Sequence, residues 1–518
     1  MTLPIVASLV EQYETIKEQF VVMQQALAPL NLTKWQIARL LAAQLYRDTP
    51  RSLGVPKLTP SNGKHAFDYK PMLDEAARKY PDRPWFFGYS GFELVVFPSA
   101  YVNEIRRLPA RTASLVDFLT TVQFGGYRLI GTDDSSNTLH KTASTDLARS
   151  IAPLGPARQE TARRAPYAVG INLGDCPQWK KVSLFWTVLD VVVATGATGL
   201  VGEPLSRDKR WLNAVRLLPI GAGIGVYISC QFPRLLRPIA ATISYFPALV
   251  VYKYMSYLLR PTIEQAAREY HDLPNGKDSP DKKLTLVHML LGRYKQGEFN
   301  HDQLVKDVIT ATFESTPTTA VSLYWMLTEL LQRPDLVEEL REEITGVLKD
   351  GKLPATQLTE LPKLDSFMRE SARVNTFHYL GLSRILKEDV QFSIGPKLPK
   401  GTIVCVDQHH IHNSTSLYPD PEVFEPQRFL RLREKPGHET RHQYTSNSPE
   451  LLTWGDGPQV CPGRVFAGNT IKILLSHLLL NYDIQYPLGT QKPPRLSFPN
   501  GSVQPDMKVQ ILVRERQR

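Results

Sequence analysis

The pattern of hydrophobic and polar positions is helical over most of this chain. Apolar residues recur every three or four positions from about residue 100 to 350. The clearest candidates are a long helix over 303–331 and a second over 334–349, which begins at Pro334 and is followed by Gly351. Proline is favoured in the first turn of a helix and glycine directly after its end. The pattern therefore predicts a mainly α fold.

Three short segments show strand patterns instead. Residues 85–97 alternate aromatic and β-branched side chains around Tyr89-Ser90-Gly91, which predicts a hairpin. Residues 389–393 and 402–406 are predicted as short strands on either side of a glycine- and proline-rich turn. No repeat or break in composition divides the chain. We therefore expect a single large domain over 61–518 with a small β-rich region, preceded by a helical lead over 1–60.

The N-terminal lead and one later segment raise the question of a membrane. Residues 1–20 and 34–47 predict amphipathic helices, and the charges within them do not fit a secretory signal. A spanning helix needs about 20 apolar residues. Residues 217–233 and 238–252 are apolar but short, and both contain prolines. They predict a buried or membrane-dipping hairpin rather than two spans.

Composition and charge narrow the class of protein. Lys and Arg number 61 against 51 Asp and Glu, a net charge of +10. A basic balance suits an anionic membrane surface or an acidic protein partner. Basic runs interleaved with aromatic residues are lacking, so we expect no nucleic acid. None of the four cysteines forms a Cys-x-x-Cys pair, which argues against a zinc ribbon or a dithiol site and fits a reducing compartment.

One cysteine has surroundings suited to a thiolate ligand. Cys461 stands in a segment rich in glycine and proline, Trp454-Gly-Asp-Gly-Pro-Gln-Val-Cys-Pro-Gly-Arg464, directly before an apolar stretch over 465–480. Glycines allow backbone N–H groups to approach the sulfur, and the positive end of a following helix favours the ionised form. An isolated cysteine is more often an inert buried residue. The weight of this interpretation therefore comes from the whole segment.

The segment resembles the haem-binding loop of the cytochrome P-450 superfamily. The resemblance rests on an aromatic residue seven positions before Cys461, a glycine four before and a glycine two after, here Trp454, Gly457 and Gly463. It implies haem b with the Cys461 thiolate as axial iron ligand, and Trp454 beside the haem in place of the usual phenylalanine. Gln459 departs from the family, since many members carry a basic residue there that pairs with a haem propionate.

A second element of the resemblance lies upstream. Glu370-Ser-Ala-Arg373 alone predicts a surface ion pair on one face of a helix. In the superfamily, the same spacing pairs with an arginine in a Phe-x-Pro-x-Arg-Phe segment, which here contains Arg428. The resemblance therefore implies a buried, mutually satisfied network of three charges that acts as scaffold.

The third element is the middle of the long predicted helix, Thr310–Ala320. A proline among threonines predicts a kinked core helix on its own. The resemblance offers a second interpretation, the oxygen-binding groove of the family, and implies that Thr318 helps to deliver protons. Pro317 occupies the position of the family's acid and Ser315 that of its glycine. Proton delivery would then depend on Thr318, water and Glu314.

Further residues are assigned by the same resemblance. A lone arginine is usually solvated, but Arg384 in Gly381-Leu-Ser-Arg-Ile-Leu386 falls where the family holds a haem propionate. His140 and Lys141 are candidate replacements for a tryptophan and arginine pairing that the sequence does not show. The regions 97–134 and 217–257 correspond to the substrate-facing parts, and their apolar residues predict a bulky lipophilic substrate. These residues are Val122, Phe124, Tyr127, Leu129, Ile220, Ile224, Tyr227 and Phe232.

The resemblance covers the chain from about residue 80. Within the superfamily, the chain is similar to fungal monooxygenases of secondary metabolism, of the ent-kaurene-oxidase-like kind. The resemblance implies the cytochrome P-450 fold and oxidation of a terpenoid, meroterpenoid, alkaloid or polyketide with O₂. Electrons would come from a separate NADPH-cytochrome P-450 reductase. We expect a monomer at the cytosolic face of the endoplasmic reticulum, attached peripherally, with a cytoplasmic protein as the alternative. Two other functions stay open: a haem-thiolate enzyme that rearranges or dehydrates its substrate without external O₂, and a non-catalytic haem sensor.

Overall fold

The computed structural model describes most of the chain from residue 50 onward. The described residues are 50, 52–58, 69–89, 92–124, 138–232, 237–271, 285–294, 300–349, 353–497 and 501–517. Gly54–Arg518 form one compact unit. Most of the predicted lead over 1–60 lies outside the described residues. Residues 56–58, its last described part, run beside the first strand, where the Leu58 and Phe86 N–H groups donate to the carbonyls of Phe86 and Pro56.

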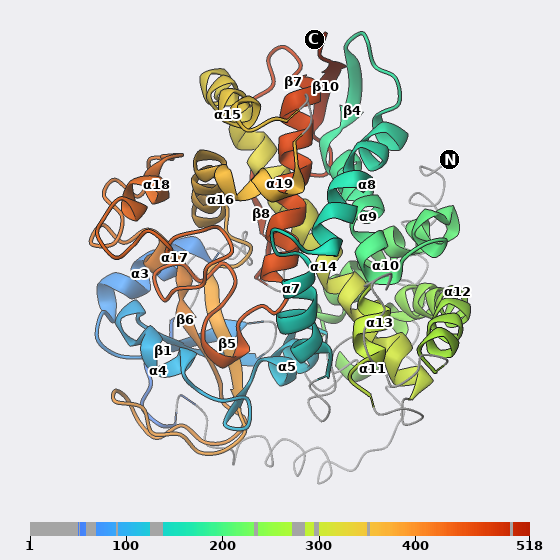
Figure 1. Cartoon of the computed structure of the whole chain (residues 1–518). Coiled ribbons are helices and arrows are strands. Elements are labelled where there is room, and N and C mark those ends of the chain that lie inside the picture. Colours follow the sequence, from blue (N-terminus) through green and yellow to red (C-terminus); the bar gives the residue numbers. More distant parts are fainter. Residues whose placement is uncertain are drawn as a thin grey trace. The chain divides into compact units, whose positions relative to one another are not determined.

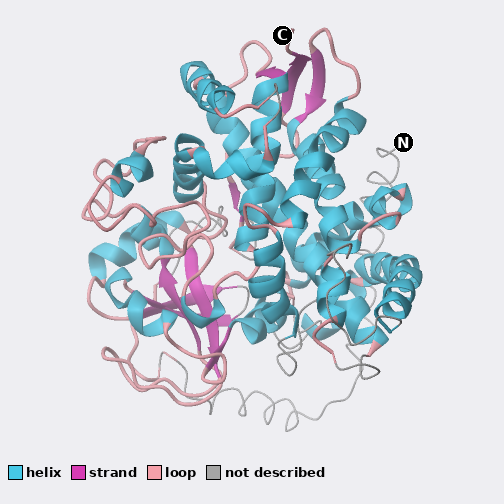
Figure 2. Cartoon of the chain, viewed as in Figure 1, coloured by secondary structure: helices cyan, strands magenta, loops and turns pink. Residues whose placement is uncertain are grey.

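Helices make up most of this unit (Figures 1 and 2). The longer described helices are α3 (Lys70–Lys79), α8 (Pro156–Leu173), α9 (Leu184–Val201), α10 (Lys209–Ser229), α11 (Arg237–Ser244), α12 (Phe246–His271), α14 (His301–Leu330), α15 (Pro334–Gly346), α16 (Pro362–Val374) and α19 (Arg464–Asn481). The shorter ones are α4 (Val102–Arg106), α5 (Leu115–Phe118), α6 (Thr138–Lys141), α7 (Ala148–Ser150), α13 (Leu286–Leu291), α17 (Gln408–His412) and α18 (Arg428–Arg433). The predicted mainly α class is confirmed.

The strands gather in separate small sheets, coloured magenta in Figure 2. The five-stranded sheet has the order β1-β2-β6-β5-β3 and consists of β1 (Trp85–Tyr89), β2 (Phe92–Phe97), β6 (Ile403–Asp407), β5 (Leu380–Leu386) and β3 (Ala113–Ser114). Its β2–β6 pair is parallel and its other pairs are antiparallel. A three-stranded sheet contains β4 (Lys180–Ser183), β10 (Gln510–Glu515) and β7 (Tyr482–Gln485), and a two-stranded one contains β8 (Leu496–Ser497) and β9 (Val503–Gln504).

Helix α14 runs through the core of the helical part. It packs against α9, α12 and α19, and α19 lies beside it in Figure 1. Its first turn is capped by Asn300, whose side chain accepts hydrogen bonds from the N–H groups of Asp302 and Gln303. Such a cap satisfies donors that the helix itself cannot. The long helix predicted over 303–331 is therefore confirmed, with its start two residues earlier.

Several predicted boundaries were wrong. Within the described residues, the segment 389–393 is not a strand and forms only a single bridge between Val390 and Leu398. The helix predicted over 334–349 ends at Gly346. The apolar segment 217–252 forms parts of α10, α11 and α12, and α10 packs back against both of the helices that follow it. The predicted hairpin at 85–97 is confirmed as β1 and β2, although Ser90 and Gly91 lie outside the described residues.

Two described helices are long and apolar enough to cross a membrane, by length and composition alone. In α9, 78% of the apolar window is buried inside the protein, so its composition is that of a core helix. In α10, 44% of the window is buried. The exposed side of α10 continues into α11 and α12, where large apolar side chains remain on the surface.

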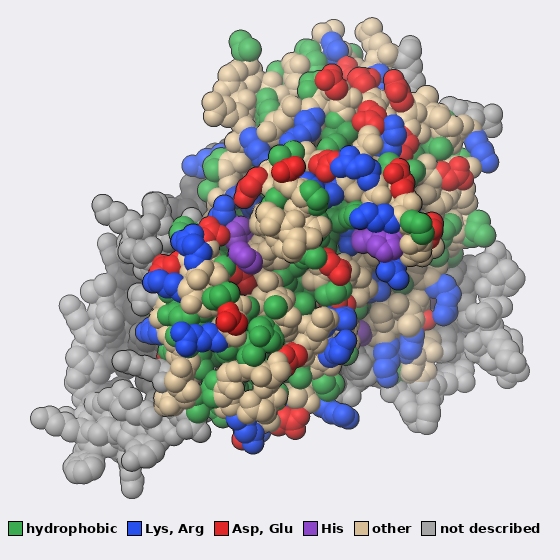
Figure 3. All heavy atoms as spheres, turned by 90° about the vertical axis from the view of Figure 1, so that its left-hand side faces the viewer, with side chains coloured by type: hydrophobic (Ala, Val, Ile, Leu, Met, Phe, Trp, Pro, Cys, Tyr) green, Lys and Arg blue, Asp and Glu red, His purple; other side chains and the backbone are tan. Residues whose placement is uncertain are grey.

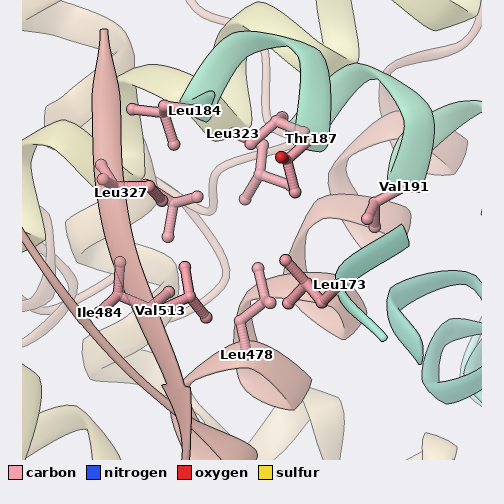
Figure 4. Close-up of a pocket in the computed structure, with 11 residues that line it drawn as sticks. Leu173, Leu184, Thr187, Val191, Leu323, Leu327, Leu478, Ile484 and Val513 are labelled. Carbon is pink, nitrogen blue, oxygen red and sulfur yellow. The ribbon is translucent and has the colours of Figure 1, made fainter. Parts of the chain in front are cut away.

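A small apolar cavity of about 20 Å³ lies between α9, α14, α19 and the β7–β10 pair (Figure 4). Its walls are aliphatic apart from Thr187. A cavity so lined does not favour water. None of its lining residues belongs to the Cys461 segment or to the threonine-rich part of α14, so it is a packing defect separate from the candidate site.

Candidate functional site

The segment before α19 folds into a tight loop around Cys461. The Cys461 N–H donates to the Trp454 carbonyl at 2.8 Å, and the Val460 N–H donates to the Gly457 carbonyl at 3.2 Å. Gly457 has φ of +74°, and a Cβ there would lie 1.8 Å from the Arg106 carbonyl oxygen. Only glycine fits at that position. The glycine of the motif thus lets the loop pass directly against α4.

The Cys461 thiol is balanced between opposing effects. Burial raises its pKa to about 11 and the Glu314 carboxylate adds to this, while the backbone N–H groups of Gly463 and Arg464 lower it. The N-terminus of α19, which begins at Arg464, also favours a negative sulfur. These donors alone do not ionise the thiol. A bound metal cation would, since metal coordination deprotonates a thiol outright.

Trp454 is fixed by Tyr444. Its indole Nε1 donates to the Tyr444 carbonyl at 2.7 Å, and the two ring centroids lie 5.4 Å apart at 70°. Edge-to-face contact of this kind suits both rings. Tyr444 was not singled out from the sequence, because nothing in its local pattern marks a residue ten positions before the tryptophan.

Arg384 is a buried arginine without an acidic partner among the described residues. It is 2% exposed, its Nη1 donates to the Ser383 carbonyl at 2.8 Å, and its Nε has no hydrogen-bond partner in the described part of the chain. Burial lowers the pKa of its guanidinium to about 10. A bulge in the β5–β6 pairing between Gly381 and Arg384, with Leu382 at φ of +52°, redirects this part of the strand. Such a guanidinium suits a carboxylate group.

The middle of α14 presents two polar side chains to an internal space. The side chains of Glu314 and Thr318 are exposed, whereas those of Thr312, Thr316 and Thr319 around them are buried. Burial nevertheless raises the pKa of Glu314 to about 7. A side chain can be both exposed and strongly desolvated when it faces a space that protein encloses, and we infer such a space beside Glu314. The Glu314 carboxylate raises the pKa of Cys461, so this space lies next to the cysteine loop.

The three predicted scaffold charges form the expected network. Arg373 donates to both Glu370 oxygens at 2.9 and 2.7 Å, and Arg428 Nε donates to Glu370 Oε1 at 3.2 Å. The Glu425 N–H adds a bond at 3.0 Å. The charged side chains of Glu370, Arg373 and Arg428 are at most 5% exposed. The prediction of a buried, mutually satisfied network is confirmed.

Comparison with known proteins decides the family. Residues 231–513 match the family described as Cytochrome P450. The cytochrome P450 monooxygenase ffsD of Aspergillus flavipes is 40% identical over 535 positions, which cover 97% of this chain and 99% of that protein. The pyrichalasin C-18 hydroxylase of Pyricularia grisea is 34% identical, covering 97% and 98%. The monooxygenase phmB of Phaeosphaeria nodorum is 37% identical, covering 96% and 88%.

The chain belongs to the cytochrome P450 family. Its relatives are fungal monooxygenases, so it is an oxidoreductase of the kind that serves secondary metabolism. The family implies a haem with cysteine thiolate ligation. The residues here fit that group: the Cys461 thiol stands before a helix N-terminus, and the buried Arg384 guanidinium has a nitrogen without a hydrogen-bond partner in the described part of the chain. The non-catalytic sensor is set aside, because the relatives are monooxygenases.

Gln459 has a different role from the basic residue of other P450s. Its Oε1 accepts from the Leu115 N–H at 2.8 Å, and its Nε2 donates to the carbonyls of Ala113 at 2.9 Å and Leu108 at 3.3 Å. Asp456 adds an ion pair to Arg106 at 2.9 Å. These contacts clamp the cysteine loop to residues 106–115. Gln459 is thus fully engaged with backbone groups.

His140 and Lys141 were predicted to replace the tryptophan and arginine that many members of the family use, and His140 lies at the cysteine loop. Burial lowers the pKa of His140, and a hydrogen bond to the Val460 backbone raises it, which places the imidazole against the loop. Lys141 is exposed at the end of α6. His140 is therefore the better candidate for a haem contact.

Three aromatic rings from distant segments meet near Glu314. Phe124 lies 6.3 Å from Phe313 of α14 and 6.4 Å from Tyr245, which stands between α11 and α12. Of the predicted substrate-facing residues, Val122 is buried, Phe124, Ile220, Ile224 and Phe232 are half-buried and Tyr227 is exposed. Tyr127 and Leu129 lie outside the described residues. Phe313, which stands among threonines, and Tyr245, which lies within the predicted region 217–257, were not singled out, because no local pattern shows that both rings lie beside Phe124.

Proposed function

We propose that the chain hydroxylates a bulky lipophilic natural product, with Cys461 as the ligand of a haem b iron. The observation that supports this most is the cysteine loop, where the Cys461 thiol stands before the N-terminus of α19 and the Glu314 carboxylate raises the pKa of that thiol. When bound, the haem supplies dioxygen activation. The chain would orient the substrate, exclude water and hold protons at Glu314 and Thr318.

Three side chains are assigned to the haem in this proposal. Arg384 would pair with a propionate, because its buried guanidinium has no carboxylate partner among the described residues. His140 would lie at the rim of the loop. Trp454, held by Tyr444, would pack beside the macrocycle. Thr318 would serve proton delivery.

The substrate class follows from the pocket and the relatives. The aromatic rings of Phe124, Phe313 and Tyr245 favour an apolar molecule. One relative is named as a hydroxylase of pyrichalasin at C-18, and we propose for this chain hydroxylation of a ring carbon or side-chain carbon in a bulky lipophilic molecule. Rearrangement without O₂ is the second candidate, motivated by Pro317 in place of the acid.

The electrons would come from NADPH through a separate reductase at the cytosolic face of the endoplasmic reticulum. Peripheral attachment is supported by large exposed apolar side chains on α10, α11 and α12, namely Leu217, Tyr227, Ile239, Ile243, Phe246, Val250, Tyr254 and Tyr257. The face drawn in Figure 3 carries Lys and Arg interspersed with Asp and Glu. Such a surface suits a protein partner better than nucleic acid.

The test combines genetics with reconstitution. A strain lacking the gene is expected to accumulate a lipophilic precursor. That precursor is incubated with purified chain, reductase and NADPH under isotopically labelled dioxygen. The proposal expects one labelled oxygen atom in the product. Product formed in an anaerobic reaction without reductase would instead support rearrangement.

A further inference from the structure

Pro317 occupies the position on α14 where the family usually carries an acid, but Glu314 supplies a carboxylate three residues earlier. Glu314 precedes Thr318 by four residues on α14, so both side chains are on one face of the helix, one turn apart. They are exposed to the internal space, while Thr312, Thr316 and Thr319 pack into the core. The helix thus directs one acid and one hydroxyl into the same space.

Hydrogen bonds along α14 fix the hydroxyl. Thr318 Oγ1 donates to the Glu314 carbonyl at 2.8 Å. Thr312 and Thr316 donate in the same way to Val308 and Thr312, at 2.7 Å each. With its proton in that bond, the Thr318 oxygen has lone pairs left to accept a further hydrogen bond.

Pro317 adds an acceptor at the same level. It has no N–H to donate to the Phe313 carbonyl, and a proline inside a helix bends it. A carbonyl released in this way is a ready partner for water. Residues 313–318 therefore offer a carboxyl, a hydroxyl and a carbonyl within about one and a half turns.

The electrostatic setting suits proton exchange. Burial alone raises the pKa of Glu314 to about 7, without a contribution from neighbouring charges. In the cysteine loop, the Glu314 carboxylate raises the pKa of Cys461 and Arg464 lowers it. His140 also lies at this loop, through its hydrogen bond with the Val460 backbone. On the described helices packed against α14, four ion pairs hold charged residues: Asp190 with Arg216, Arg260 with Asp302, Lys472 with Asp365, and Glu370 with Arg373. Arg464 donates to the Cys461 carbonyl, and Arg369 donates to the carbonyls of Gln443 and Ser446. A general acid works best with a pKa near the operating pH.

We propose that Glu314 is the proton donor on the oxygen-binding side of this P450, in place of the acid lost at Pro317. The inference rests on the proposed function. Each turnover combines substrate C–H, O₂, two electrons from NADPH and two protons into C–OH and water. Glu314 donates a proton to the Thr318 oxygen or to a bridging water. On the Thr318 route the hydroxyl turns away from the Glu314 carbonyl and gives up its own proton, and solvent reprotonates the carboxylate.

The experiment compares Glu314→Gln with a rescue variant. Glu314→Gln keeps the shape and removes the acid, and Glu314→Gln/Pro317→Glu returns an acid to the family position. Asp302→Asn is the matched control, because it removes an exposed carboxylate at the start of the same helix. All four proteins are loaded with haem, reduced and saturated with carbon monoxide, and the infrared C–O stretch is followed from acid to alkaline pH.

Wild type and Asp302→Asn are expected to show a stretch that shifts with a midpoint near pH 7, because the charge on Glu314 alters the local field. The stretch of Glu314→Gln should be independent of pH. With reductase and NADPH, oxygen consumption by Glu314→Gln should fall by about a hundredfold or more, with a larger share released as hydrogen peroxide. The rescue variant should recover part of that loss.

A wild-type pH profile and a wild-type peroxide share in Glu314→Gln would overturn the inference. If that variant does not retain haem, Glu314→Asp replaces it, since it keeps a titrating carboxyl on a shorter side chain. A stretch independent of pH in Glu314→Asp would overturn the inference as well. Failure of the proposed function looks different, because wild type would then give no thiolate-type carbon monoxide spectrum.

Discussion

At the residue scale, two neighbouring glycines show how closely the cysteine loop is built. Gly455 and Gly457 both have positive φ, +69° and +74°. A Cβ at Gly455 would lie 3.9 Å from its nearest neighbour, whereas one at Gly457 would overlap the Arg106 carbonyl. Gly455 is needed only because the backbone there is left-handed. Gly457 is needed for the same reason and also because the Arg106 carbonyl leaves no room for a Cβ.

We therefore expect different costs for alanine at the two positions. Gly455→Ala should lower the free energy of unfolding by about 1–2 kcal/mol, the cost of a left-handed residue with a Cβ. Gly457→Ala should cost several times as much and reduce haem content, because the loop must move away from α4. Thermal unfolding and haem per chain measure both effects. Equal losses in the two variants would contradict the contact with Arg106.

Replacement of Arg384 should have opposite effects on the stability of the haem-free chain and on the retention of haem. Replacing it by methionine removes a buried charge that has no acidic partner among the described residues, so the haem-free chain should become more stable. The haem-loaded protein should lose its cofactor about 10–100-fold faster, since a hydrogen bond to a charged group contributes about 1.5–3 kcal/mol. Transfer of haem to apomyoglobin measures the rate. An unchanged rate would show that Arg384 does not hold a propionate.

At the scale of elements, the Glu370 network joins α16 to the segment that leads to α18. Arg373 also donates to the His412 carbonyl at 2.8 Å, and Arg428 donates to the Pro419 carbonyl at 2.6 Å. One carboxylate therefore balances two buried guanidinium groups and orders the chain between them. This arrangement stabilises the part of the molecule that precedes the cysteine loop.

Glu370→Gln should consequently be severe. It leaves two buried positive charges without their carboxylate and is expected to cost about 3–5 kcal/mol. Glu160→Gln, which breaks the exposed pair with Arg163, should cost less than about 1 kcal/mol. The thermal unfolding midpoints of the haem-loaded proteins make the comparison. Similar midpoints would mean that the network contributes little.

The sequence predicted elements well where their signals were local. The helix over 303–331 has a continuous apolar pattern and an Asn300 cap, and the 85–97 hairpin alternates clearly. Strand β5 was not predicted, because a bulge breaks its alternation at Arg384. Likewise, the engagement of Gln459 with residues 108–115 depends on contacts across some 345 positions, which no local pattern can reveal.

At the scale of the whole molecule, the exposed apolar side chains of α10, α11 and α12 indicate a surface that contacts another molecule or a membrane. Ile239 and Phe246 are 54% and 62% exposed. Leu488, in the turn after β7, is fully exposed, and Figure 1 shows β7 near the top of the view and α11 in its lower right part. Single exposed apolar residues are ordinary, whereas a group of them marks a contact surface.

If this surface inserts into a membrane, charges there should release the protein. Ile239→Glu/Phe246→Glu is expected to weaken binding to anionic vesicles at least about tenfold, because each buried apolar side chain contributes about 1.5–3 kcal/mol. Leu488→Glu should have no effect. Vesicle flotation of the full chain, and of the chain without residues 1–50, separates this surface from the N-terminal lead. Equal flotation of all variants would contradict the assignment.

The central claim is that Cys461 binds haem iron through its thiolate. The most direct measurement is the reduced carbon monoxide difference spectrum of wild type and of Cys461→Ala, prepared in parallel. Wild type should show the red-shifted absorption that only a thiolate ligand produces, and Cys461→Ala should lack it. Retention of that absorption in Cys461→Ala would contradict the account.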